Sequence, residues 1–142
     1  MTVRGTDTIT VLNAIKDNRG NITRWKSTVL RNVHFERCIA VQAHTVAREV
    51  QRDSVLMIWK GMVDADGLRC VPHNQLAVVE DLDKVFSLEC GDYIIPGMCE
   101  DVPESGKPLK DFLRTHDVLQ ITSVECCLYG SSYLQHWEVK AE

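Results

Sequence analysis

Six cysteines and five histidines are the residues of this chain best suited to bind a metal or act as nucleophiles. Cys70 and His73 lie three positions apart, and Cys90 and Cys99 could complete a tetrahedral ligand set. Structural zinc sites usually take their ligands as tight pairs, about two to four residues apart. A predicted strand instead separates Cys90 from Cys99. The spacing therefore predicts no metal centre, and no cofactor is expected.

Motifs for covalent catalysis and for phosphate binding are absent from the sequence. No cysteine lies in a glycine-flanked turn ahead of a helix, where the helix N-terminus would stabilise a thiolate. The patterns G-x-S-x-G, G-x-G-x-x-G and G-x-x-x-x-G-K do not occur. Asp64 and Asp66 precede Gly67 but lack the later ligands of a calcium loop, so they predict a turn. We therefore expect that the protein is not an enzyme.

Composition and charge indicate a single domain over residues 1–142. The chain has 44% hydrophobic residues and a net charge of −4, with no basic run. It can bury a core, and it lacks the cations that tight, sequence-independent DNA binding needs. No apolar run of about 18 residues predicts a membrane span. Residues 1–10 are polar, so we expect an intracellular, reducing location and free, mostly buried thiols.

Alternating polar and apolar residues predict a mainly β fold. Residues 9–29 form a predicted hairpin around a turn at 17–21, and the returning strand continues past Leu30 with a kink or bulge. The apolar run at 55–59 indicates a strand buried on both faces or at the centre of a small barrel, with Trp59 in the core. Further strands are predicted at 93–95, 117–125 and 133–140, the last two joined by a loop at 130–132.

Two short helices and two long loops complete the expected fold. One helix begins at Asn74 and continues to Phe86, and the other follows Pro108. Residues 40–53 are expected to be an irregular loop, and the segment 98–107 has the composition of an acidic loop. Five to six strands with two short helices imply an α+β chain that is mainly β, a small, partly closed β-barrel with long loops.

Aromatic residues beside charged or polar neighbours are candidates for contacts between subunits. Trp25 lies between Arg24 and Lys26, and Trp137 lies between His136 and Glu138. Half-buried strand positions explain both tryptophans, and an intersubunit contact is the alternative, because interfaces are enriched in tryptophan. His136 is either a pH-sensitive group of the same interface or a solvated histidine.

Several stretches of the chain together carry a family resemblance. They are RWKSTVLRNVHFE (24–36), DSVLMI (53–58), LECGDYII (88–95), and ITSV (121–124) with GS (130–131) and HWEV (136–139). These stretches resemble an uncharacterised family of small tailed-phage and prophage proteins that look like components of the head-to-tail connector. Their order along the chain is similar to that of the head-closure, or stopper, proteins of long-tailed phages.

The resemblance implies a structural role in the virion neck, after assembly in the cytoplasm of a bacterial host. Six or twelve copies would form a homo-oligomeric ring below the portal and adaptor proteins and above a tail-terminator or tail protein. The ring would seal the channel after packaging, let double-stranded DNA pass transiently, and have no membrane contact. Two alternatives remain open: a tail-terminator or adaptor ring of the same neck, and an unrelated small β-barrel that binds a ligand.

Two loops, 40–52 and 98–107, are the candidates to reach into the channel of such a ring. The second carries the acidic residues Glu100, Asp101 and Glu104. These carboxylates would line the lumen or bind a basic partner, and a solvated loop is the alternative, because charge runs are usually solvated.

Overall fold

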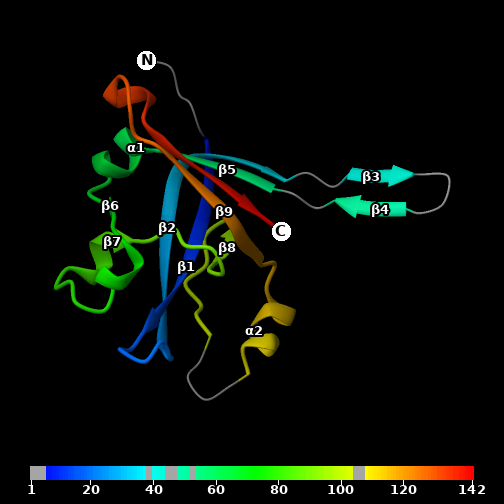
Figure 1. Ribbon diagram of the computed structural model, residues 1–142, viewed down its shortest axis with the longest axis horizontal. Coiled ribbons are helices and arrows are strands. Elements are labelled where there is room, and N and C mark those ends of the chain that lie inside the picture. Colours follow the sequence, from blue (N-terminus) through cyan, green and yellow to red (C-terminus); the bar gives the residue numbers. More distant parts are fainter. Residues whose placement is uncertain (1–5, 38–39, 44–47, 52–53, 104–107) are drawn as a thin grey trace.

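Six antiparallel strands form a closed ring in the computed structural model, which describes residues 6–37, 40–43, 48–51, 54–103 and 108–142 (Figure 1). Around the ring the order is β1-β2-β5-β10-β9-β8, and β8 pairs again with β1. The six strands are β1 (Asp7–Lys16), β2 (Ile22–Arg37), β5 (Ser54–Trp59), β8 (Tyr93–Pro96), β9 (Leu119–Cys127) and β10 (His136–Ala141). The expected small, mainly β barrel is confirmed.

Two strand pairs and two helices lie outside this ring. The strand pairs are β3 (Ala40–Ala43) with β4 (Arg48–Gln51), antiparallel, and β6 (Arg69–Cys70) with β7 (Val85–Phe86), parallel. The helices are α1 (Lys60–Ala65) and α2 (Leu109–Thr115), and short 3-10 turns occur at His73–Gln75, Leu82–Lys84 and Ser132–Leu134. No helix of the described residues is long and apolar enough to cross a membrane.

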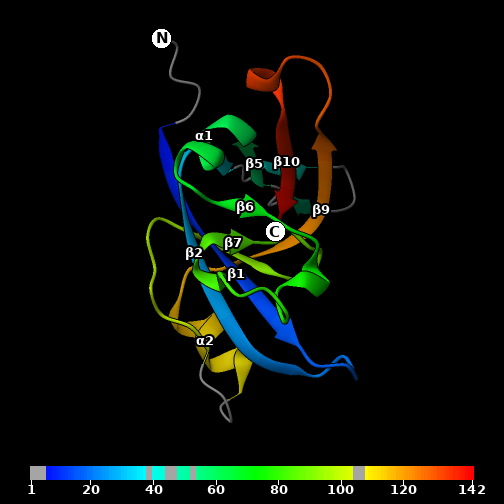
Figure 2. The ribbon, with the colours of Figure 1, turned by 90° about the vertical axis from the view of Figure 1, so that its left-hand side faces the viewer.

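Strand β1 is buried on both of its faces. Successive residues of a strand point to opposite faces, and all residues from 9 to 15 are buried. Ile9 and Val11 belong to the core inside the barrel, and Ile15, further along the same face, packs against Leu76 and Val85 from the segment that follows β6. Figure 2 shows that segment in front of the β1–β2 hairpin. A strand with both faces covered is nearly continuously apolar, which explains the unbroken burial from residue 9 to residue 15.

The predicted hairpin and its bulge are both confirmed. The turn at residues 17–21 closes through the Asp17 N–H, which donates to the Asn21 carbonyl oxygen at 2.9 Å. Asn32 has a φ of 60°, and the β1–β2 register shifts beside it. Beyond this point residues 34–37 of β2 pair with β5 instead of β1. The bulge therefore forms a corner of the barrel, where one strand serves two neighbours.

Two helix and loop predictions are wrong. The described residues of the segment 40–53 are not an irregular loop: β3 and β4 pair as a two-stranded arm that stands away from the barrel (Figure 1). Residues 74–86 do not form a helix. Leu76 and Val85 pack against Ile15 of β1, and Val85 and Phe86 pair with β6. Helix α1 was not predicted, whereas the turn predicted at Asp64–Gly67 is present at its end, where the Gly67 N–H donates to the Asp64 carbonyl oxygen. The helix after Pro108 is confirmed.

Trp59 and Trp137 are buried to a different extent from that expected. Trp59 is only half-buried, because burial alternates along β5 and places Leu56 and Ile58 inside the barrel instead. Trp137 lies in the core at 6% exposure and contacts the edge of Phe86, with ring centroids 6.3 Å apart. The outward-facing residues of β5 are only partly buried, so this strand, unlike β1, is not buried on both faces.

Candidate functional site

The loop that follows β8 is fastened to β1 by a buried hydroxyl. Thr10, which has no exposed surface, donates a hydrogen bond to the Gly97 carbonyl oxygen at 2.9 Å and accepts one from the Cys99 N–H at 2.9 Å. Gly97 has a φ of 82°, a conformation that glycine adopts without strain, and its N–H donates to the Thr8 carbonyl oxygen. The backbone at Cys99 is thus held by residues nearly ninety positions away in the sequence.

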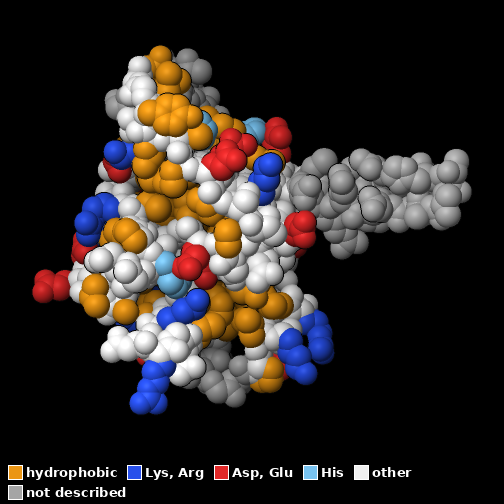
Figure 3. Space-filling model, viewed as in Figure 1, with side chains coloured by type: hydrophobic (Ala, Val, Ile, Leu, Met, Phe, Trp, Pro, Cys, Tyr) orange, Lys and Arg blue, Asp and Glu red, His pale blue; other side chains and the backbone are white. Residues whose placement is uncertain are grey.

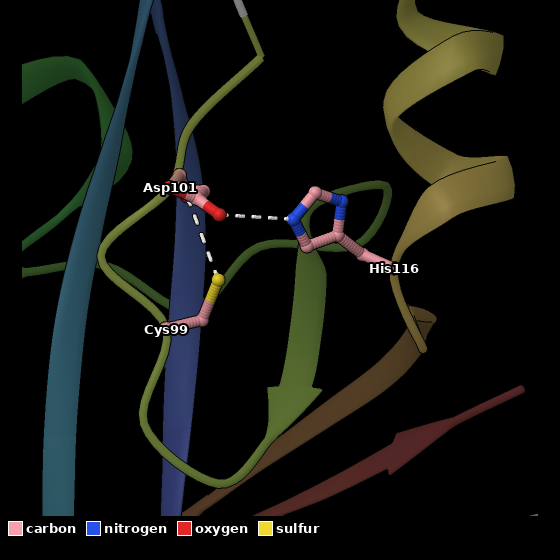
Figure 4. Close-up of side chains that lie close together, drawn as sticks. All are labelled: Cys99, Asp101 and His116. Atoms are coloured by element: carbon pink, nitrogen blue, oxygen red, sulfur yellow. Dashed lines mark hydrogen bonds and ion pairs between the residues drawn. The ribbon is translucent and has the colours of Figure 1, made fainter.

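Three side chains of types that bind metals come together at this loop (Figure 4). The Cys99 Sγ, a carboxylate oxygen of Asp101 and a ring nitrogen of His116 all lie within 4.8 Å of one another. Asp101 Oδ2 is 3.2 Å from His116 Nε2, and Cys99 Sγ is 3.8 Å from the Asp101 carbonyl oxygen. The Asp101 side chain is 76% exposed and that of His116 is 25% exposed. The cluster therefore lies at the surface, within reach of a dissolved ion.

The ring of His116 is held in place by the end of α2. It stacks on Phe112 with centroids 4.0 Å apart, and its Nδ1 lies 3.1 Å from the Phe112 carbonyl oxygen. Thr115 Oγ1 lies 3.0 Å from the same nitrogen and is itself within hydrogen-bond distance of the Asp111 carbonyl oxygen. Two tautomers fit these neighbours. An Nδ1–H donates to the Phe112 carbonyl oxygen and leaves the Nε2 lone pair facing the Asp101 carboxylate, whereas an Nε2–H donates to Asp101 and lets Thr115 Oγ1 donate to Nδ1.

An open hollow of about 340 Å³ adjoins these side chains. Residues 101–103 form one side of it, and Asp111, Phe112 and His116 of the α2 segment form another. The apolar faces of Phe112 and Pro103 share this hollow with the Asp101 and Asp111 carboxylates. A small polar ligand or ordered water therefore has access to the Asp101–His116 pair.

The structure describes two of the three residues of the predicted acidic run. Glu100 and Asp101 are exposed, and Asp101 turns to His116, while Glu104 lies outside the described residues. Sequence reasoning missed His116 altogether. It also grouped Cys99 with Cys70, His73 and Cys90, which do not belong to this cluster. The local signal was the pair Cys99 and Asp101, two positions apart; only the fold brings His116 beside them.

A second group of polar side chains is buried against β1. Asn13 donates to the Ser87 carbonyl oxygen at 2.7 Å and to Asp92 Oδ2 at 2.9 Å, and accepts from the Ser87 N–H at 3.1 Å. His73 Nδ1 lies 2.8 Å from Glu89 Oε2, without the alignment of a hydrogen bond, and 3.6 Å from Asp92 Oδ2. Burial raises the pKa of Asp92, against the lowering effects of the Asn13 hydrogen bond and of His73.

The predicted intersubunit residues belong to different parts of the barrel. Trp25 is half-buried against Tyr93 of β8, with centroids 5.7 Å apart, and His136 is half-buried beside Trp59 of β5 at 6.1 Å. The side chain of Trp137 is used by the core of its own chain, so its ring is not offered to a second subunit. Trp25 and His136 therefore do not form one patch with Trp137.

The five described cysteines are free thiols, as expected, but they are not mostly buried. Cys90 and Cys126 are exposed, and Cys70, Cys99 and Cys127 are partly exposed. Burial, with a smaller contribution from Cys126, raises the pKa of Cys70 to about 12. Cys70 is therefore a protonated thiol that does not act as a nucleophile near neutral pH.

The comparisons with known proteins assign the chain to a family without giving it an activity. No curated protein and no solved structure matches it. A family model described as "Family of unknown function (DUF6751)" matches residues 4–142, nearly the whole chain. The chain therefore belongs to this family of unknown function.

Proposed function

We propose that the protein is a ring subunit of a tailed-phage neck, the head-closure protein that seals the DNA channel and docks the tail. The observation that carries the proposal is the arm of β3 and β4, which extends from a closed barrel between two of its neighbouring strands, β2 and β5 (Figure 1). A subunit placed at the rim of a channel needs a rigid body and an element that reaches inward. The barrel and the arm supply these two parts.

The root of the arm is fastened to the barrel on two sides. Residues 34–37 of β2 pair with residues 54–57 of β5, so both chain segments leave the barrel together. At the end of β2, the Arg37 guanidinium makes a bidentate contact with Asp117, and its Nη2 donates to Oδ1 at 2.7 Å. This hydrogen bond lowers the pKa of Asp117. The contact directs the base of the arm, although an exposed pair contributes little to stability.

Exposed apolar side chains gather at the connection between β9 and β10, at one end of the molecule (Figure 3). They are Leu128, Tyr129, Tyr133 and Leu134, which are between 42% and 77% exposed. Exposed aromatic side chains close together in the chain are typical of contact surfaces between proteins. In a ring of six or twelve copies this connection is the best surface for a neighbouring copy, with Trp25 and His136 as further contact candidates.

The electrostatic character of the chain suits a conduit for DNA. Its net charge of −4 does not favour a tight hold on a polyanion, so DNA would slide past. The partners would be portal and adaptor proteins above and a tail-terminator or tail protein below. The location would be the virion neck.

The mass of the protein in solution tests this proposal. Light scattering would be recorded for the protein alone and after mixing with a preformed portal and adaptor ring of the same phage. We expect a monomer that joins the ring in a fixed stoichiometry of six or twelve. Tyr129→Ser should weaken this incorporation, and Val78→Ser, at an equally exposed position elsewhere, should not.

Other results of the same experiment would contradict the proposal. A protein that stays monomeric at high concentration and ignores the ring is not a stopper, and the hollow beside α2 then becomes the place to look for a small ligand. A protein that joins isolated tail tubes but not the portal and adaptor ring is a tail terminator. One that binds the portal directly, in place of the adaptor, is an adaptor protein.

The arm has a test of its own. Replacement of residues 40–51 by a short Gly-Ser linker should leave the barrel folded, because β2 and β5 pair without it. We expect rings that still bind the neck but heads that lose packaged DNA, measured as DNA accessible to added nuclease. Full retention of DNA in heads carrying such rings would show that the arm does not close the channel.

A further inference from the structure

We propose that Cys99, Asp101 and His116 bind a divalent transition-metal ion, with Zn²⁺ as the ion that best fits these donors. A thiolate, a carboxylate and an imidazole are the three side-chain ligands that zinc takes in proteins. Harder ions fit less well, because calcium and magnesium prefer oxygen ligands throughout. This inference concerns the isolated chain and does not depend on the role proposed in the phage neck.

The distances suit a tetrahedral ion. With metal–ligand bonds of about 2.0–2.3 Å, two ligand atoms of a tetrahedral site lie about 3.3–3.8 Å apart. Asp101 Oδ2 and His116 Nε2 are already 3.2 Å apart, and one ligand atom from each of the three residues lies within 4.8 Å of the others. A modest movement of the Cys99 side chain would complete a three-ligand site.

The orientation of His116 supplies an independent argument. Its Nδ1 faces the Phe112 carbonyl oxygen at 3.1 Å, and its Nε2 faces the Asp101 carboxylate at 3.2 Å. When Nδ1 carries the proton and donates to Phe112, the Nε2 lone pair faces the Asp101 carboxylate, and a cation placed between Nε2 and Asp101 is held by both. When Nε2 carries the proton, it donates to Asp101, and Thr115 Oγ1, 3.0 Å from Nδ1, donates to that nitrogen. Metal binding selects the first tautomer. Histidine ligands of metals commonly donate their second ring N–H to a backbone carbonyl in this way.

The backbone around the cluster is set before any ion arrives. Thr10 fixes the N–H of Cys99 through its buried hydroxyl, and Phe112 stacks on the ring of His116. The loop after β8 and the end of α2 are thus held at a separation that the three side chains can bridge. A site held in this way loses less conformational entropy on binding.

The chain supplies three ligands and leaves the fourth position open. The hollow of about 340 Å³ that Asp101 and His116 line provides the space for water or a small oxygen ligand there. Binding deprotonates the thiol, so one proton passes from Cys99 to the buffer as the Zn–S bond forms. The bound ion would join the loop after β8 to the end of α2.

Metal titration of the full, reduced chain tests the proposal. Zn²⁺ would be followed by calorimetry, and Co²⁺ by the near-ultraviolet absorbance of its thiolate complex. We expect one equivalent of either ion. Cys99→Ser should abolish the cobalt–thiolate band, and His116→Gln should weaken Zn²⁺ binding at least tenfold. Cys90→Ser and His136→Gln, which change a cysteine and a histidine outside the cluster, should bind as the unchanged protein does.

A second measurement needs no variant and so avoids the question of folding. Alkylation of the unchanged protein would be mapped by mass spectrometry with and without one equivalent of Zn²⁺. Zinc should slow the modification of Cys99 and leave that of the exposed Cys90 and Cys126 unaltered. Equal rates at Cys99 with and without zinc, or no binding at one equivalent, would overturn the proposal. Neither result would bear on whether the chain forms a ring.

Discussion

Two histidines of this chain each face a carboxylate, in opposite surroundings. His73 lies beside Glu89 and the buried Asp92, whose side chain is 5% exposed and already bonded to Asn13. His116 faces Asp101, which is 76% exposed and has a thiol and a hollow beside it. At the first place the Asp92 carboxylate is already bonded to Asn13 inside the protein, and at the second the Asp101 carboxylate is open to solvent beside a thiol. Burial and prior hydrogen bonds decide which role the pair takes.

The largest loss of stability should follow from removing the hydrogen bonds of Asn13 in the buried group around Asp92. Asn13→Ala removes the hydrogen-bond partner of the Ser87 N–H and carbonyl and of the Asp92 carboxylate, all buried. Leaving such groups unpaired costs about 2–5 kcal/mol of unfolding free energy. Urea unfolding would measure the loss. Asn74→Ala, at an exposed position, is the control and should be close to neutral; a similar loss in both variants would contradict this assignment.

A smaller loss of stability is expected at Thr10, which holds the loop of Cys99 and Asp101 to β1. Thr10→Val keeps the shape of the side chain but strands the Gly97 carbonyl and the Cys99 N–H, at a cost of about 1–3 kcal/mol. Because Cys99 would shift, zinc affinity should fall as well, which calorimetry would detect. Thr122→Val alters an exposed threonine and is the matched control. Unchanged stability in Thr10→Val would mean that this hydroxyl does not hold the loop.

The smallest effect is expected in the pH dependence of stability, which reports on the buried Asp92. Burial raises the pKa of Asp92 in the folded protein above its unfolded value, so the folded state favours the protonated carboxyl. The stabilisation from this group is therefore full at low pH and is lost as pH rises from about 4 through the folded pKa.

Unfolding midpoints measured over that pH range would reveal this contribution as a difference between variants. The unchanged protein should lose stability relative to Asp92→Asn as pH rises. Asp66→Asn, which alters an exposed carboxylate in a turn, should follow the unchanged protein. Parallel curves for the unchanged protein and Asp92→Asn would show that Asp92 titrates alike in the folded and unfolded states.

The ring strands could be read from the sequence because each carries its own local signal. Alternation and turn residues located the β1–β2 hairpin, β8 and the β9–β10 pair, and the change of phase near Leu30 located the bulge. The helix predicted at 74–86 was wrong because the helical spacing of its apolar residues reflects separate packing contacts, such as those of Leu76 and Val85 with Ile15 of β1. The loop predicted at 40–53 was wrong because β3 and β4 pair only with each other and lack the burial pattern of a barrel strand.

The candidate site could be predicted only in part for a related reason. Asp101 was singled out from a run of acidic residues, but its role depends on His116, fifteen positions away at the end of a helix. Cys99 was considered only together with Cys70, His73 and Cys90, a ligand set rejected on its spacing, because spacing alone cannot tell which loops meet. Trp59, expected in the core, is half-buried, and Trp137, expected at a half-buried position or an intersubunit contact, lies in the core, since the sequence does not fix which face of a strand turns inward.

Strand β10 has a consequence for the time course of synthesis. It is the last element of the described chain, yet it lies between β5 and β9 and pairs with both along residues 136–141. Until residue 141 has been made, these two neighbours expose unpaired backbone and the barrel stays open. A nascent chain with such edges is prone to wrong strand pairing, and the barrel can close only after its final strand arrives.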